Sequence, residues 1–300
     1  MKQQNNTPES SRSRIWLYLG LAAGVMILGS AAIFVRLAQA SGVVTSFYRT
    51  AIAAILLFIP FIINKRKKAH IIQKRSAWIA VAGGLLFAAD LALWSSGIVL
   101  GGATNPTLMA NTAPLWVGLG SLVFFHERRV RTFWIGLWIA MAGVMLVLGQ
   151  DMILALEFGL GSLLGLLAAI FYGAYFLVTQ AGRSQLDTIS YNWISTASSA
   201  LVLLLLSLLF GEPLTGYNPI TWFSFLASAL IVQVTGWLLL NYVQGHLPAS
   251  IVSPTLLLQP VLTAFIAIPL FGEQFTAWHI LGGIAVLTGI FMIHRSRFST

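Results

Sequence analysis

The sequence contains no cysteine and very few charged residues. Without cysteine the chain forms no disulfide and offers no thiolate to a metal ion. Only 8% of the residues are charged, whereas a typical soluble domain has about 25%. Hydrophobic residues make up 58% of the chain. A protein with so few charges cannot cover its surface with groups that bind water, so the composition indicates an integral membrane protein.

Motifs of several enzyme classes are absent as well. The sequence has no GxxxxGK[ST] loop for nucleotide phosphates, no HExxH zinc motif and no GxSxG nucleophile turn. The histidines fall in loops or near expected helix ends, and no group of them has the spacing of metal ligands: His70, His126, His246, His279 and His294. We therefore expect neither an enzyme nor a cofactor or metal site.

The net charge of +9 raises the question of a nucleic-acid partner. The lysines and arginines lie in short clusters between apolar runs, and no stretch is long enough for a separate basic domain. We therefore expect no nucleic acid as a partner, and interpret the basic clusters as signals of membrane topology, including the run at 65–75. Contact of that run with anionic lipid is the alternative.

Long apolar runs occupy most of the chain. A helix rises about 1.5 Å per residue, so about 20 apolar residues cross a hydrocarbon core of about 30 Å. This rule predicts an all-α membrane protein with ten transmembrane helices. The expected helices are at residues 15–38, 42–63, 77–99, 104–125, 132–149, 159–181, 190–210, 220–243, 249–271 and 276–294.

The start of the chain also resembles a secretory signal peptide. Arg12 and Arg14 precede an apolar run, and residues 38–40 resemble a cleavage site. The run is too long for a signal peptide, whose apolar core has about 7–15 residues, and Arg36 lies just before the supposed cut. We therefore interpret this run as the first membrane helix.

The positions of lysine and arginine predict the orientation. If the amino terminus is cytoplasmic and the chain crosses ten times, every lysine and arginine outside the helices falls on the cytoplasmic side. The opposite side then carries only acidic loop residues: Asp151, Glu157, Glu212 and Glu273. This asymmetry predicts a protein of the cytoplasmic (inner) membrane, surrounded by lipid, with both termini in the cytoplasm.

The two halves of the sequence resemble each other at one constant offset. The aligned pairs are Ala103 and Ala249, Pro114 and Pro260, Phe125 and Phe271, Glu127 and Glu273, Gly136 and Gly282, and Gly143 and Gly289. Each half holds five expected helices, and an odd number makes the halves enter the membrane in opposite directions. The pattern predicts two inverted-topology repeats, which suit alternating access. A static bundle that arose by gene duplication is the alternative.

Residues of the matching stretch are expected to be architectural. The paired glycines, seven residues apart on one helix face, allow close helix contact. The two glutamates precede a helix, where a carboxylate meets free N–H groups and the positive end of the helix dipole. The two prolines are expected inside their helices, as passive kinks or as bending points of a gate.

Two five-helix halves that each end in P-x(10)-F-x-E-x(8)-G-x(6)-G resemble the EamA family of the drug/metabolite transporter superfamily. The second helix segment, SFYRTAIAAILL, resembles that family too. The resemblance divides the chain into a polar, disordered start (1–14), a first repeat (15–149), a linker (150–158), a second repeat (159–294) and a tail (295–300). It implies a secondary carrier with a small-molecule substrate.

Export of an amino acid or a similar metabolite is the first expectation from this resemblance. Import, other solutes such as nucleosides, sugars or cationic drugs, and less readily a membrane-embedded enzyme or a scaffold are the alternatives. The sequence does not determine the oligomeric state.

Ionisable residues inside a membrane cost about 2.5–3.5 kcal/mol each and therefore mark functional sites. Arg49 and Asp90 alone lie well inside expected helices, at about 10 and 14 Å from the outer ends at the rise of a helix. We expect them to face one central cavity. They form either a structural ion pair or a site where Asp90 binds a coupling proton or an ammonium group and Arg49 binds a carboxylate. The other candidates for the cavity wall are Trp94, Asn111, Tyr172, Tyr175, Gln233, Trp237, Asn241 and Gln259.

Overall fold

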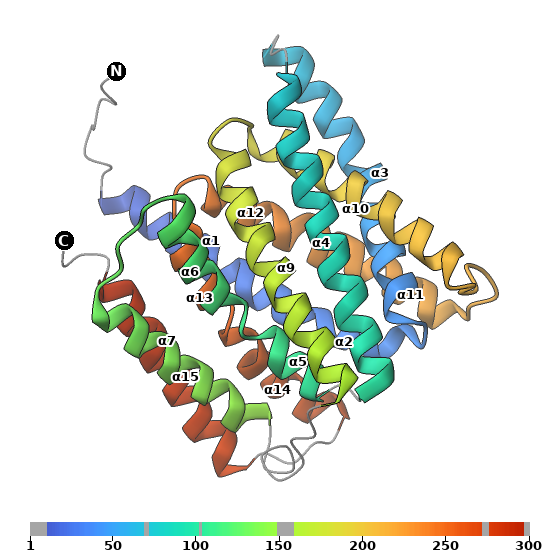
Figure 1. Ribbon diagram of the computed structural model, residues 1–300. Helices are drawn as coiled ribbons and strands as arrows, with labels where there is room; N and C mark the ends of the chain where they lie inside the picture. Colours follow the sequence, from blue (N-terminus) through green and yellow to red (C-terminus); the bar gives the residue numbers. More distant parts are fainter. Residues whose placement is uncertain (1–10, 69–71, 102–103, 149–158, 272–275, 297–300) are drawn as a thin grey trace.

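The computed structural model describes residues 11–68, 72–101, 104–148, 159–271 and 276–296 (Figure 1). Regular structure within these ranges is entirely helical. Ten helical segments are long and apolar enough to cross a membrane. The structure thus confirms the expected all-α membrane fold in the part of the chain that it describes.

Six of the ten spans are continuous helices. They are α3 (Gly42–Lys68), α4 (Lys74–Gly101), α7 (Arg131–Leu148), α9 (Leu160–Arg183), α10 (Thr188–Leu209) and α15 (Ala277–Ser296).

The other four spans were expected as single helices but are built from shorter pieces. The first is α1 (Ser11–Gly29) with α2 (Ala31–Ala38), and the fourth is α5 (Thr104–Ala110) with α6 (Ala113–Phe124). The eighth consists of α11 (Pro219–Ala227), the π-helix η1 (Ser228–Gly236) and α12 (Trp237–Gln244). The ninth is α13 (Ala249–Thr255) with α14 (Leu258–Phe271).

The breaks in the fourth and ninth spans are explained by proline. A proline lacks an N–H, and its ring clashes with the carbonyl four residues earlier. That carbonyl belongs to Ala110 for Pro114 and to Leu256 for Pro260, and the first helical piece ends at or just before it in both spans. Both prolines lie inside a helix as expected, but the expectation that they kink the middle of one continuous helix is wrong. They lie in the first turn of α6 and of α14, where a proline N–H has no helical partner to lose.

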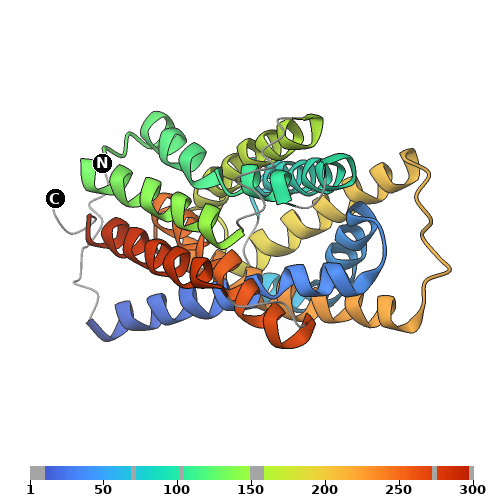
Figure 2. The ribbon, with the colours of Figure 1, turned by 90° about the horizontal axis from the view of Figure 1, so that it is seen from below.

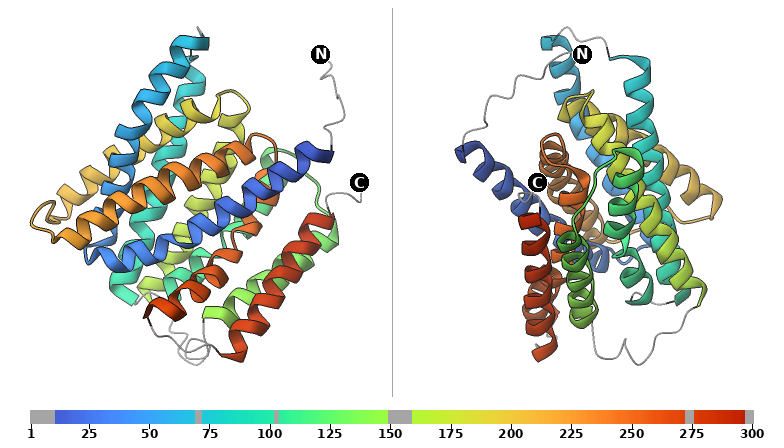
Figure 3. Two further views of the ribbon diagram at one scale, coloured as in Figure 1. Left: turned by 180° about the vertical axis from the view of Figure 1, so that it is seen from behind. Right: turned by 60° about the vertical axis from the view of Figure 1, so that its left-hand side comes forward.

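Packing between the helices repeats when the two halves are exchanged. The contact of α4 with α9 corresponds to the contact of α1 with α12. The helices α1 and α12 lie side by side in Figure 3. The contact of α4 with α10 corresponds to that of α3 with η1. The pairs α3–α10 and α7–α15 correspond to themselves, as expected for helices at a two-fold axis. This pattern is that of two inverted repeats.

The α7–α15 pair, seen from below in Figure 2, is joined at its matching glycines. A Cβ atom on Gly143 would lie 2.6 Å from the carbonyl oxygen of Gly282, and one on Gly282 would lie 2.6 Å from that of Gly143. A Cβ on Gly136 would lie 2.7 Å from the carbonyl oxygen of Gly289. The two backbones therefore touch at positions where only glycine fits.

The ends of the bundle differ in charge. The start of α1, the end of α3, the start of α4, the α6–α7 and α9–α10 connections and the end of α15 lie at one end, along the top and left of Figure 1. We call it the basic end, because most of the described lysines and arginines lie there, among them Lys65, Arg66, Lys67, Lys74, Arg75, Arg128, Arg129, Arg131, Arg183 and Arg295. The α10–α11 connection, with Glu212, lies at the opposite end.

Candidate functional site

A cavity of about 190 Å³ lies within the bundle, between helices of both halves. It is lined by Leu28, Ala31, Arg49, Phe87, Asp90, Leu91, Trp94, Thr107, Ala110, Asn111, Tyr172, Val232, Trp237 and Gln259. The breaks of the fourth and ninth spans border it, because Ala110, Asn111 and Gln259 lie at those breaks. Broken helices beside a central cavity are typical of substrate sites in carriers with inverted repeats.

Two opposite charges share this cavity. The side chains of Arg49 and Asp90 are each only 7% exposed, and their charges act on each other and on Tyr172. The two residues nevertheless form no contact ion pair, and Nε of Arg49 is buried without a hydrogen-bond partner. A buried charge without a close partner is strongly unfavourable. The pair is therefore poorly explained as a structural ion pair and suits a site that receives charged groups from a ligand.

Aromatic rings form one wall of the cavity. The rings of Phe87 and Trp237 lie 4.9 Å apart, centre to centre, and Tyr172 lies 6.4 Å from Trp237. The Arg49 guanidinium lies 5.9 Å from the centre of the Phe87 ring. Tyr175 packs behind this wall, 4.9 Å from Phe87 and 5.3 Å from Trp237. The wall is therefore aromatic, and it stands next to both charges.

A hydrogen bond between two helices also borders the cavity. The indole N–H of Trp94, on α4, donates to the hydroxyl of Thr107, on α5, over 3.1 Å. The backbone carbonyl of Thr107 accepts both the side-chain amide of Asn111, over 2.8 Å, and the backbone N–H of the same residue, over 3.1 Å. Thr107 therefore links the third span to the broken fourth span and orients Trp94.

Seven of the ten candidate residues line the cavity: Arg49, Asp90, Trp94, Asn111, Tyr172, Trp237 and Gln259. The structure places the other three elsewhere. Tyr175 lies behind the wall, and Asn241 is buried beside its hydroxyl. The amide of Gln233 lies between η1 and α10, where it donates to the Thr196 hydroxyl over 3.5 Å.

Sequence reasoning missed Thr107, Phe87 and Leu91. The two apolar residues share the helix face of Asp90 and Trp94, so helical periodicity alone would have indicated them. Thr107 lies in the span with the lowest mean hydropathy of the ten, 1.3, which is a signal for a polar helix beside a cavity.

Glu127 has a different role from the expected one. Its carboxylate was expected to cap the next helix, but the structure places it against the side chains of Arg129, Gln180 and Ser250. The helix α7 begins only at Arg131, beyond this contact. Glu273, the corresponding residue of the second half, lies outside the described residues.

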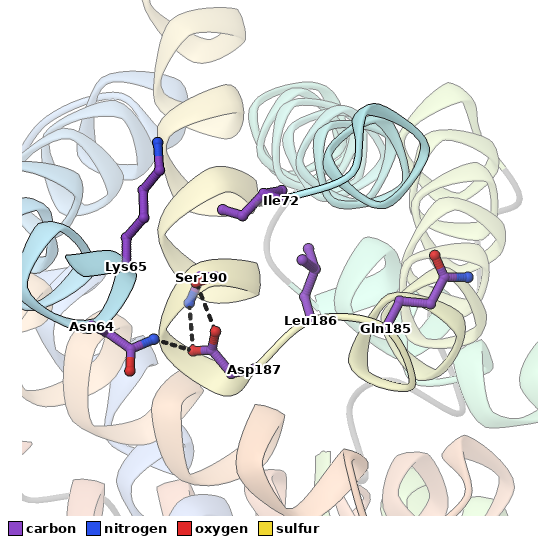
Figure 4. Close-up of a pocket in the computed structure, with 7 residues that line it drawn as sticks. All are labelled: Asn64, Lys65, Ile72, Gln185, Leu186, Asp187 and Ser190. Carbon is purple, nitrogen blue, oxygen red and sulfur yellow. Dashed lines mark hydrogen bonds between the residues drawn. The ribbon is translucent and has the colours of Figure 1, made fainter. Parts of the chain in front are cut away.

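A second cavity, of about 130 Å³, lies at the basic end (Figure 4). Its carboxylate, Asp187, accepts hydrogen bonds from the backbone N–H groups of Ile189 and Ser190 at 3.1 Å and from the Asn64 amide at 2.8 Å. These are the contacts of a helix cap that also ties α3 to α10. Because these hydrogen bonds already use the Asp187 carboxylate, we interpret the second cavity as part of the structural contact between α3 and α10.

Comparisons with known proteins agree with this architecture. The family model of the EamA-like transporter family matches residues 15–149 and 159–295. The uncharacterized transporter YoaV of Bacillus subtilis (strain 168) is 25% identical over 247 residues, which are 81% of this chain and 84% of that protein. A solved crystal structure superimposes with a TM-score of 0.77 at 16% identity, over 94% of this chain and 99% of the other, and so shows the same fold. Two family matches that cover both halves make this chain a membrane protein of the EamA-like transporter family.

Proposed function

We propose that this transporter exports amino acids or similar small metabolites across the cytoplasmic membrane as a secondary carrier. The observation that carries the proposal is the presence of Arg49 and Asp90 in one cavity without a contact ion pair. An amino acid brings a carboxylate for Arg49 and an ammonium group for Asp90. Each buried charge then gains the close partner that the protein itself does not supply.

The aromatic wall suits the remainder of such a substrate. Phe87, Tyr172 and Trp237 present ring surface next to both charges. An apolar or aromatic side chain packs on these rings, and an ammonium group gains about 0.5–2 kcal/mol from a ring face. The cavity therefore favours a small zwitterion with an apolar part over a large polar solute such as a sugar.

Alternating access is supported by the symmetry of the packing. If the two halves exchange their conformations, the self-paired contacts α3–α10 and α7–α15 stay in place, and the others swap with their counterparts. The cavity between the halves then opens to the other side of the membrane. Under this proposal the basic end, with both termini, faces the cytoplasm.

A proton is the second ligand that Asp90 suits. Protonation would remove the buried charge of Asp90 when no ammonium group is bound beside it. Competition between a proton and an ammonium group for Asp90 would couple export to the proton gradient. The alternatives of import and of other small solutes use the same cavity.

Counterflow in proteoliposomes tests this function. Vesicles are preloaded with one unlabelled amino acid at a time, and entry of the same labelled compound is followed. We expect transient accumulation with at least one apolar or aromatic amino acid and none in protein-free liposomes. Flat traces across the whole panel would refute the amino-acid proposal, and nucleosides, sugars and organic cations would then be tested in the same way.

A further inference from the structure

Four polar side chains form a cluster at the basic end of the bundle: Glu127, Arg129, Gln180 and Ser250. The Ser250 hydroxyl donates to the Glu127 carboxylate over 2.8 Å, and the Gln180 amide donates to its other oxygen over 3.3 Å. The guanidinium of Arg129 donates to both Glu127 and Ser250. The cluster is half-sheltered, since the side chain of Glu127 is 21% exposed and that of Arg129 is 13% exposed.

The cluster joins one element of the first half to two elements of the second half. Glu127 and Arg129 come from the α6–α7 loop of the first half, Gln180 from α9 and Ser250 from α13 of the second. Gln180 also accepts a hydrogen bond from the backbone N–H of Ala249, over 2.6 Å. The side chain of one glutamine thus bridges the start of α13 to the carboxylate of Glu127.

The backbone next to Glu127 is held in a costly conformation. His126 has φ of 55°, in the left-handed region, which costs a residue other than glycine roughly 1–2 kcal/mol. The second half carries Gly272 at the matching position. This reversal lets the Glu127 N–H donate to the Ser121 carbonyl over 3.2 Å, and it turns the loop back toward α9 and α13.

Along α9 a buried side chain lies between the cluster and the central cavity: Tyr172 lines the cavity, Phe176 is buried one turn further, and Gln180 of the cluster follows after another turn. Tyr175, Phe176, Leu240, Val243 and Ala249 belong to one buried apolar cluster on α9, α12 and α13. A substrate in the cavity cannot reach the basic end unless these helices separate from the first half. The polar contacts of Glu127 and Arg129 with Gln180 and Ser250 are among the ties that such a separation must break.

We propose that the Glu127–Arg129–Gln180–Ser250 cluster is a latch that keeps the basic end of the carrier shut, and that its release opens the cavity to that side. The inference rests on the proposed alternating access. Polar contacts near the surface suit a latch, because water replaces them when they separate. The glycine contact of α7 with α15 is not such a tie, since it joins backbones that the symmetry keeps together. Arg129 has no equivalent in the second half, where the matching residue is Phe275.

The absence of cysteine makes the latch testable by thiol labelling. One cysteine is introduced at Ala110, which lines the cavity, and a membrane-impermeant maleimide is added from the basic end or from the opposite end in oriented vesicles. In this background Glu127→Gln and Arg129→Gln each weaken the latch by removing one charged partner of the Glu127–Arg129 contact. Arg128→Gln is the matched control, since Arg128 is exposed and next to the latch but outside it.

We expect both latch variants to raise the labelling rate from the basic end by about tenfold, the population change that follows loss of one hydrogen bond to a charged group. Labelling from the opposite end should fall in the same variants, because one cavity opens to one side at a time. The double variant should gain less than the product of the two single gains, because both changes break the shared Glu127–Arg129 contact. Arg128→Gln should label as the parent does.

Labelling that stays at the control rate in both latch variants would refute the latch. A rise from both ends together would refute it too, because that result indicates loosened packing. Since labelling needs no substrate, a failed latch with active counterflow leaves the proposed function intact, and sided labelling without counterflow leaves the latch intact. Should one variant not fold, as judged by size-exclusion chromatography, the other removes the same contact.

Discussion

Replacing Gly282 by alanine tests whether α7 and α15 form the fixed contact on which the two halves turn. A Cβ at this position would lie 2.6 Å from the Gly143 carbonyl oxygen and 2.9 Å from the backbone nitrogen of Val147. Neither backbone atom can move without moving its helix. The neighbouring Gly283 is the matched control, because a Cβ there would meet only Cγ1 of Val261, at 3.4 Å.

The magnitude follows from two opposing contributions. Alanine is better than glycine inside a helix by about 0.8–1.0 kcal/mol, and both variants gain this amount. Overpacking costs about 1–3 kcal/mol, and only Gly282→Ala incurs it. The free energy of unfolding of Gly282→Ala should therefore lie about 1–3 kcal/mol below that of Gly283→Ala.

Unfolding of both variants in mixed micelles, titrated with SDS and followed by circular dichroism, measures this difference. Gly283→Ala should be as stable as the parent or slightly more stable. Equal stability of the two variants would refute the close backbone contact, and with it the assignment of α7–α15 as the fixed pair.

Three further predictions concern single side chains. His126→Gly should raise the free energy of unfolding by roughly 1 kcal/mol, because glycine adopts the left-handed conformation without strain; SDS titration checks this, and a loss of stability would contradict the assigned backbone. Thr107→Val, which removes the acceptor of the Trp94 indole, should weaken apparent substrate affinity in counterflow by about 0.5–1.5 kcal/mol, whereas Thr107→Ser should retain it; equal affinities would exclude a positioning role. Asp187→Ala removes the cap of α10 and should cost about 1–2 kcal/mol of stability with counterflow affinity unchanged, and altered affinity would give the second cavity a role in binding.

The number and type of the helices could be predicted from the sequence because they depend on local properties. Hydropathy over about 20 residues finds each span. The matching prolines and glycines reveal the two halves. The breaks were within reach too, since Pro114 and Pro260 end a helix through the carbonyl four residues earlier. What misled the prediction was treating a proline within an apolar run as a kink in one helix.

The membership of the cavity was only partly predictable. Asp90 and Trp94 share a helix face, so their proximity follows from periodicity. Gln233 and Asn241 are polar residues of the eighth span. Gln233 lies within the π-helix η1 and Asn241 follows it. The π-helix changes which residues of the span face the cavity, and no residue pattern predicts it. Polarity within a span therefore did not distinguish cavity residues from buried polar contacts.

The latch could not be predicted from the sequence at all. Glu127 meets Gln180 and Ser250 across 53 and 123 residues of chain. Such contacts depend on how the two halves dock, which local patterns do not contain. Glu127 precedes a helix in the sequence, so the prediction assigned its carboxylate to the cap of that helix. This assignment is wrong.

The proposed function requires that Arg49 and Asp90 bind the substrate within one cavity. Counterflow of the best substrate by Asp90→Asn and Arg49→Gln, beside Glu212→Gln as a control at the opposite end, tests it most directly. Both cavity variants should fold and reach the membrane but lose at least about tenfold in transport, as expected when a charged contact is removed, while the control transports normally. Full transport by either cavity variant would contradict it.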